Sequence, residues 1–171
     1  MPRHLTASRR QTLLQLSALA ITPLALSAQA ALERGQRMAW PELQLVDGSR
    51  WTAKHADNRA VVAVFWSVTC PFCRRHNEHV QKLHEAARGK ALAVLGISRD
   101  KDEAAVRRYL VEKRYSFPVT MDAAALEPQL APRRVIPLTV TLDRQGRFVQ
   151  SYAGEMFEED VLELLVLADA R

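Results

Sequence analysis

Residues 60–73 read A-V-V-A-V-F-W-S-V-T-C-P-F-C and carry the strongest signal of fold class in the chain. Residues 60–66 form a continuous apolar run rich in β-branched side chains, which is typical of a central strand buried on both faces. Pro71 follows, and proline is favoured in the first turn of a helix because its missing N–H has no helical partner there. The stretch therefore predicts a buried strand that leads directly into a helix, with Cys70 at the helix start and Cys73 one turn later.

The sequence on both sides of this stretch alternates between strand and helix patterns. The predicted strands are a hairpin at 43–46 and 50–52 and single strands at 60–66, 91–97, 117–121, 138–142 and 147–152. Three predicted helices run from Pro71 to near Gly89, from Asp102 to Lys113, and over 126–131. A last predicted helix follows the acidic residues Glu155, Glu158, Glu159 and Asp160, and its apolar face consists of Phe157, Val161, Leu164, Leu165 and Ala168. A chain of 171 residues without an internal repeat favours one domain. We expect a three-layer α/β domain with a central mixed β-sheet flanked by helices.

The N-terminus has the three parts of a secretory signal. Arg3, Arg9 and Arg10 precede an uncharged run over residues 11–32, and A-Q-A at 28–30 supplies the small residues of a cleavage site. We therefore expect a signal peptide over 1–30, a domain over 31–171, and a periplasmic or otherwise extracytoplasmic protein without a membrane anchor after cleavage. An ordinary N-terminal helix and an uncleaved anchor are the alternatives.

The arginine pair leaves the export route open. The segment S-R-R-Q-T-L-L at 8–14 partly resembles the twin-arginine export motif, although arginine pairs also occur in plain secretory signals. Without residues 1–30 the chain loses three arginines and no acidic residue, so 24 basic residues become 21 against 19 acidic ones and the net charge falls from +5 to +2. A charge so close to neutral gives no reason to expect nucleic acid or anionic membrane as a partner.

The two cysteines lie three positions apart, which favours reactivity over structural bridging. A disulfide that closes so small a loop removes little entropy from the unfolded chain. At a helix N-terminus, unpaired N–H groups and the helix dipole stabilise an anion, so they lower the pKa of the Cys70 thiol and supply the thiolate that attacks a disulfide. Cys73 then attacks the mixed disulfide and releases the substrate. An inert cysteine pair is the plain alternative.

A metal site is a further alternative, because Cys70, Cys73, His76 and His79 recur every three residues. On a helix each step of three falls back by about 60°, so four ligands spread around half the circumference and cannot meet one tetrahedral ion. A metal-transfer protein that holds Cu(I) through the two cysteines alone stays open.

Two segments carry a resemblance to a known family. Residues 65–73, F-W-S-V-T-C-P-F-C, resemble the F-W-x-x-W-C-P-x-C segment of the thioredoxin superfamily, and above all its TlpA/ResA-like exported reductases. Residues 135–146, V-I-P-L-T-V-T-L-D-R-Q-G, resemble the P-T-x-x-x-I-D-x-x-G stretch of that family, and the likeness covers roughly residues 40–168. The resemblance implies a thioredoxin fold with an N-terminal β-hairpin.

The resemblance also implies the residues that meet the substrate. It implies that Pro137 is a cis-proline beside the sulfurs and that Ile136 offers its backbone to a substrate strand; an ordinary turn proline is the alternative. We expect Trp66, Pro71 and Phe72 to contribute to the substrate-binding surface around the cysteines.

Three positions depart from the family pattern. Thr69 replaces the tryptophan before the first cysteine, and Val64 stands where the superfamily has a buried acid or amide. His76 replaces the glutamate of C-x-x-C-x-x-E. A histidine there is a possible acceptor for the Cys73 proton, with a pH dependence near neutrality; a surface histidine at the helix edge is the alternative.

These observations together predict a thiol–disulfide oxidoreductase. The resemblance implies a reductase of protein disulfides, such as those of apo-cytochrome c or copper-site thiols, with an upstream electron donor and no cofactor beyond the Cys70–Cys73 disulfide. We expect a monomer. A thiol peroxidase is a further alternative, because Ser67 fits the motif P-x-x-x-[ST]-x-x-C, but Ala63 occupies the proline position. The sequence leaves the direction of electron flow open.

Overall fold

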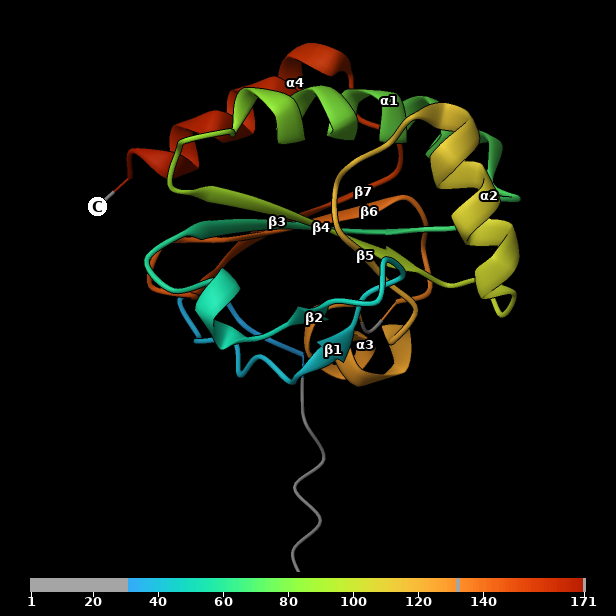
Figure 1. Cartoon of the computed structure of the whole chain (residues 1–171). Helices are drawn as coiled ribbons and strands as arrows, with labels where there is room; N and C mark the ends of the chain where they lie inside the picture. Colours follow the sequence, from blue (N-terminus) through green and yellow to red (C-terminus); the bar gives the residue numbers. More distant parts are fainter. Residues whose placement is uncertain (1–30, 132, 171) are drawn as a thin grey trace, which may run out of the picture.

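A five-stranded sheet forms the centre of the domain in the computed structural model, which describes residues 31–131 and 133–170 (Figure 1). The strand order is β5-β4-β3-β6-β7. The strands are β3 (Ala60–Trp66), β4 (Leu92–Ser98), β5 (Val119–Thr120), β6 (Leu138–Leu142) and β7 (Phe148–Ala153). β3, β4 and β5 run parallel to one another, whereas β6 and β7 join as antiparallel strands, so the sheet is mixed, as the sequence predicts.

Strand β3 lies in the middle of the sheet because both of its faces are apolar. All of its residues are buried, and so are those of β4. The two strands pair in register from Ala60 with Leu92 to Trp66 with Ser98. Their carboxyl ends therefore lie at the same edge of the sheet, and the loop that leads to Cys70 starts from this edge.

Helices and a hairpin cover the two faces of the sheet (Figure 1). On one face lie α1 (Pro71–Ala86), α4 (Glu158–Glu163) and the 3-10 helix η2 (Leu164–Ala168), with α2 (Glu103–Lys113) beside α1. On the other face lie α3 (Ala123–Leu130), the 3-10 helix η1 (Ala53–His55) and a small sheet of β1 (Leu43–Gln44) and β2 (Arg50–Trp51). Each face has its own hydrophobic core, with Phe65 and Leu126 in one and Val64 and Cys73 in the other.

Some predicted boundaries differ from those observed. The fifth strand of the prediction, 117–121, shortens to β5, because Pro118 has no N–H with which to continue the ladder. Helix α3 begins at Ala123 rather than Leu126, and the hairpin strands have two residues each.

The predicted place of Phe157 is wrong. Its side chain is 77% exposed, because the residue is the extended N-cap of α4 and does not belong to the helical face. Val161, Leu164 and Ala168 are buried, as predicted. Glu158, Glu159 and Asp160 form the first turn of α4, where acidic side chains stabilise the positive end of the helix dipole.

The first described residues are attached to the body of the domain by backbone hydrogen bonds. The Leu32 N–H donates to the Gln129 carbonyl in α3 (2.9 Å), and the Phe148 N–H at the start of β7 donates to the Gln36 carbonyl (2.8 Å). The predicted signal over residues 1–30 lies outside the described residues. Within the described ranges, no helix has the length and apolarity needed to cross a membrane.

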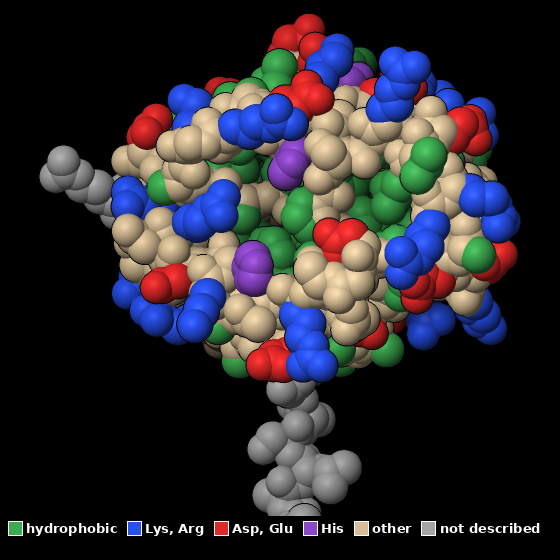
Figure 2. Space-filling view, viewed as in Figure 1, with side chains coloured by type: hydrophobic (Ala, Val, Ile, Leu, Met, Phe, Trp, Pro, Cys, Tyr) green, Lys and Arg blue, Asp and Glu red, His purple; other side chains and the backbone are tan. Residues whose placement is uncertain are grey.

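Charged side chains of both signs surround the face seen in Figure 2, and hydrophobic side chains gather toward its middle. The charge on this face is therefore dispersed.

Candidate active site

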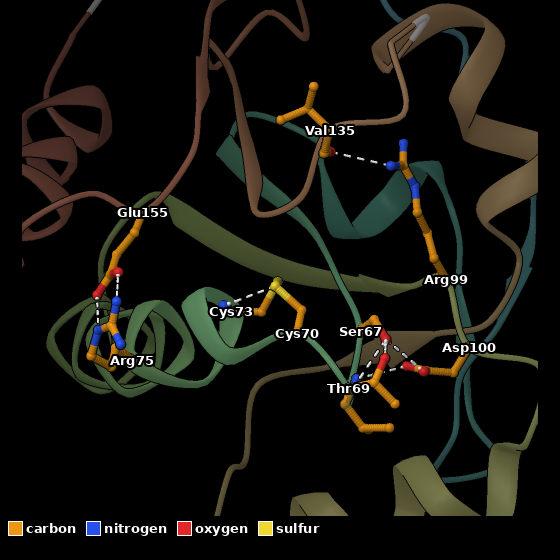
Figure 3. The surroundings of a disulfide bond; sticks show 10 residues. Ser67, Thr69, Cys70, Cys73, Arg75, Arg99, Asp100, Val135 and Glu155 are labelled. Atoms are coloured by element: carbon orange, nitrogen blue, oxygen red, sulfur yellow. Dashed lines mark hydrogen bonds and ion pairs between the residues drawn. A yellow bond between two sulfur atoms is a disulfide. The ribbon is translucent and has the colours of Figure 1, made fainter.

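Cys70 and Cys73 form a disulfide at the start of α1, with their Cα atoms 5.2 Å apart (Figure 3). Cys70 is the N-cap, and its sulfur accepts a hydrogen bond from the Cys73 N–H (3.1 Å). Cys70 is partly exposed, whereas Cys73 is fully buried. The outer sulfur therefore lies at the helix N-terminus, where an anion is stabilised. This arrangement suits the predicted roles of Cys70 as attacking thiolate and Cys73 as resolving thiol.

The loop before Cys70, residues 67–69, is held by Asp100, a residue that the sequence analysis missed (Figure 3). The Asp100 carboxylate accepts hydrogen bonds from the Ser67 hydroxyl (2.7 Å) and the Val68 N–H (3.0 Å). The Ser67 oxygen in turn accepts from the Thr69 N–H (3.2 Å). A signal for Asp100 existed, because polar residues directly after strand β4 must lie at the same sheet edge as Cys70. We call residues 67–70 the thiol loop.

A second loop, residues 133–137, leads into β6 and is called the proline loop. Its Ile136–Pro137 peptide bond is cis, which is the geometry that the family resemblance implies. Pro137 is buried, and Ile136 is partly buried and packs against both hydrophobic cores. Val135 is 41% exposed, and its carbonyl accepts a hydrogen bond from Arg99 Nη1 (3.1 Å, Figure 3). The roles of Ile136 and Pro137 toward a substrate stay predictions.

The rim around the disulfide carries apolar and basic side chains. Pro71 and Phe72 are exposed, Phe72 to 57%, so both are accessible to a substrate. The Arg75 guanidinium lies 5.4 Å from the centre of the Phe72 ring and donates to Glu155 (Nε to Oε1 2.6 Å). This hydrogen bond holds the pKa of Glu155 below its usual range. The positive charge of Arg75 is thus balanced at the rim.

The structure corrects the expected substrate contact of Trp66. This side chain is fully buried at the end of β3, and its ring lies 5.4 Å from that of Tyr109 in α2. A central strand with two covered faces places its last aromatic residue in the core, so the Trp66 side chain packs in the hydrophobic core and is not accessible to a substrate.

His76 is fully buried, so its alternative as a surface histidine is wrong. Its Nδ1 accepts from the Met156 N–H (3.3 Å), so the ring proton is on Nε2 and is donated to the Thr139 hydroxyl oxygen (2.9 Å). Thr139 in β6 pairs with Val64 in β3. The hydrogen bond between His76 and Thr139 therefore lies beside Val64, the position at which the superfamily has a buried acid or amide.

Burial lowers the pKa of His76 to about 4. The imidazole is therefore neutral near pH 7, and the expected pH dependence near neutrality is corrected to a more acidic range. Because both ring nitrogens already have partners, accepting the Cys73 proton requires one of these hydrogen bonds to break. That role of His76 stays a prediction.

His79 is not part of one ligand set with the cysteines. Its Nδ1 lies 3.2 Å from the Met156 carbonyl, and its side chain is 20% exposed. The His76 nitrogens face Met156 and Thr139, so the two histidines are both fixed to other parts of the fold.

Comparisons with known proteins agree with this geometry. The sequence profile of the AhpC/TSA family matches residues 35–155. The thiol-disulfide oxidoreductase ResA of Halalkalibacterium halodurans is 24% identical over 168 residues, which cover 93% of this chain and 96% of that protein.

Two solved structures share the fold. A thiol:disulfide interchange protein of Chlorobium tepidum superposes with a TM-score of 0.73 at 18% identity, over 81% of this chain and 99% of the other. A secreted thiol-disulfide isomerase of Corynebacterium glutamicum gives 0.71 at 23% identity, over 90% and 99%.

Proposed function

This chain belongs to the AhpC/TSA family and is a thiol–disulfide oxidoreductase, and we propose that it reduces protein disulfides outside the cytoplasm. The observation that carries the proposal is the unequal exposure of the two sulfurs. Cys70 is accessible at the helix N-terminus beside an exposed rim, and Cys73 is buried one turn later. This is the arrangement that a two-step thiol exchange needs.

The exchange begins with the reduced pair. The Cys70 thiolate attacks one sulfur of the substrate disulfide, forms a mixed disulfide and expels the other substrate sulfur as a thiolate. The Cys73 thiol then loses its proton, and its thiolate attacks the Cys70 sulfur and releases the second substrate thiolate. The substrate leaves as a dithiol after gaining two electrons and two protons, and the enzyme is left with the Cys70–Cys73 disulfide. A dithiol of an upstream donor protein must then reduce the pair again.

The charges near the sulfurs support the reducing direction. A dithiol becomes a strong oxidant when nearby positive charge stabilises its thiolate form. Here Arg75 is balanced by Glu155, and burial keeps His76 neutral. The helix N-terminus and the exposed Arg74 are left as the stabilising influences, so only part of the positive charge at the start of α1 acts on the thiolate, which favours a reducing pair.

The open rim supports a protein substrate. Phe72 in the first turn of α1 and Val135 in the proline loop are both well exposed. Val135 lies across from the two cysteines in Figure 3. An extended segment that carries its own disulfide or thiol pair, as in apo-cytochrome c or a copper-binding protein, is the substrate class that we propose.

The reduction potential of the Cys70–Cys73 pair tests the proposed direction. Equilibration with dithiothreitol buffers should give a value closer to the roughly −270 mV of thioredoxin than to the roughly −120 mV of the oxidant DsbA. A value near that of DsbA would contradict the reductase assignment and would make the protein an oxidant.

A further inference from the structure

Two consecutive residues after β4 contact the two loops of the active site (Figure 3). Consecutive side chains of an extended chain point to opposite sides. Arg99 continues the extended path of β4, because its N–H donates to the Trp66 carbonyl (2.9 Å). The Arg99 side chain therefore reaches the proline loop, and the Asp100 side chain reaches the thiol loop.

Asp100 fixes the thiol loop through several donors. Its Oδ1 accepts from Ser67, and its Oδ2 accepts from the Val68 N–H and from the Ser98 hydroxyl (2.8 Å). The Cys70 N–H donates to the Ser67 carbonyl (3.2 Å). By fixing Ser67, Asp100 therefore also fixes the backbone position of Cys70, which carries the attacking sulfur.

Arg99 fixes the proline loop from within the fold. Its side chain is only 12% exposed, and its guanidinium carbon lies 5.2 Å from the centre of the Phe65 ring. Nη1 donates to the Val135 carbonyl, while Nε lies 2.9 Å from Glu127 Oε1 in α3. One end of the proline loop is thus tied to the sheet by a charged side chain.

The ion pair of Arg99 with Glu127 is by itself weak evidence for a stabilising role. Replacing a whole buried ion pair by apolar side chains of similar volume is often neutral or stabilising, whereas removal of one partner alone leaves the other charge unpaired and lowers stability. Nη2 of Arg99 has no hydrogen-bond partner within residues 31–131 and 133–170, so its burial carries a cost that packing alone does not explain. A role in positioning the proline loop gives a reason for an arginine at position 99.

We propose that Arg99 and Asp100 together set the gap between the thiol loop and the proline loop, and that Arg99 is thereby a positioning residue for protein substrates. This inference rests on the proposed function, because it assumes that a substrate segment lies between the two loops. A small disulfide needs only Cys70, whereas a protein segment needs Cys70 and the proline loop at the correct separation. The two residues therefore affect the two kinds of substrate differently.

The test compares a protein disulfide with a small one. Reduced wild type and variants are assayed for insulin reduction with dithiothreitol as electron donor, and for the single-turnover reaction with 5,5′-dithiobis(2-nitrobenzoate). In Arg99→Met, kcat/KM for insulin should fall by a factor about tenfold larger than the factor by which the rate with the small disulfide falls. Most of this fall should come from a higher KM. A tenfold effect is the size expected for one lost charge-assisted hydrogen bond. In Asp100→Asn both rates should fall together, and the pH profile of Cys70 alkylation by iodoacetamide should shift.

Arg107→Met and Asp102→Asn serve as matched controls, because these residues lie on or before α2 and contact Glu103 and the Ala105 N–H instead of the two loops. Both should leave the ratio of the two rates at its wild-type value. If Arg99→Met does not fold, Arg99→Lys is judged by the same ratio, because one ammonium group cannot reproduce the contacts of the planar guanidinium. Parallel loss of both rates in the Arg99 variant, or a ratio equal to that of Arg107→Met, would overturn the inference.

Failure of the proposed function has a different signature. If wild type reacts with the small disulfide but does not reduce insulin, the reductase proposal fails. The same variants are then compared in the oxidation of a reduced peptide dithiol. A lower rate with the peptide but not with the small disulfide in the Arg99 variant still supports the role of Arg99. An unchanged ratio of the peptide rate to the small-disulfide rate still overturns it.

Discussion

The unequal burial of Cys70 and Cys73 gives the first prediction at the residue scale. Cys70→Ala should abolish disulfide exchange, because the accessible sulfur at the helix N-terminus is lost. Cys73→Ala should still attack but accumulate mixed disulfides, because no buried thiol is left to release the substrate. Non-reducing gels and mass spectrometry of the trapped species check both variants. Normal turnover by Cys73→Ala without trapped species would reverse the assignment.

Burial of His76 makes the stability of the fold dependent on pH. The folded protein keeps this imidazole neutral down to about pH 4, whereas the unfolded chain protonates it near 6.5. Between these values the unfolded state binds more protons, so the free energy of unfolding falls as the pH drops from 6.5 to 4. The contribution of this one group is about 3 kcal/mol, present above pH 6.5 and lost near pH 4.

His76→Gln isolates that contribution. Glutamine keeps a donor and an acceptor for Thr139 and Met156 but does not titrate. Urea unfolding at pH 7, 6, 5 and 4 should therefore show a smaller loss of stability in the variant than in wild type. His55→Gln, at an exposed histidine, is the matched control for the loss of an imidazole. Equal slopes for wild type and His76→Gln would contradict the buried neutral imidazole.

The sequence predicts the reactive residues better than the residues that support them. Cys70 at a helix start follows from the apolar run before it and from Pro71 after it, both of which are local patterns. Asp100 and Arg99 could not be assigned in this way, because their partners in the two loops are more than 25 positions away in the sequence and are brought close only by the pairing of β4 with β3 and of β3 with β6. Whether His76 is buried depends in the same way on contacts with β6 and the segment before α4.

At the element scale, a glycine in β4 marks a close approach of another segment. A Cβ atom added at Gly96 would lie 2.8 Å from Phe117 Cε2 and 3.1 Å from Trp66 Nε1. Gly96→Ala should therefore lower the free energy of unfolding by about 1–3 kcal/mol through overpacking, as measured by urea unfolding.

Phe117→Leu tests the origin of this strain. The substitution removes the ring atom that the new methyl group meets, so the double variant should be more stable than the sum of the two single losses predicts. Strictly additive losses would indicate that the strain comes from elsewhere.

The sequence predicts the bounds of strands with a continuous apolar run well, and the bounds of elements with a weaker hydrophobic pattern less well. β3 and β4 are continuous apolar runs, and their predicted bounds agree with the structure to within one residue. β5 is short because Pro118 interrupts it, and Phe157 lies outside α4 because the helix starts one residue later. These boundaries depend on single hydrogen bonds and caps, which a hydrophobic pattern does not specify.

At the scale of the whole molecule, the fold begins close to the predicted cleavage site. Exported protein should have an intact mass that corresponds to a start near Ala31, because the sequence predicts cleavage after Ala30. Mass spectrometry of the secreted or periplasmic fraction measures this directly. Recovery of the full chain from Met1 in a membrane fraction would contradict the predicted signal.

The hydrogen bond from Leu32 to Gln129 lies directly beside the predicted cleavage site. The predicted scissile bond lies two residues before this anchor, and a peptidase needs an accessible, unpaired backbone on both sides of the bond that it cuts. Folding and processing therefore compete for the same few residues. We therefore expect a chain that crosses the membrane unfolded to be cut before the anchor forms, and a chain exported already folded to be cut more slowly, because Leu32 must first be released.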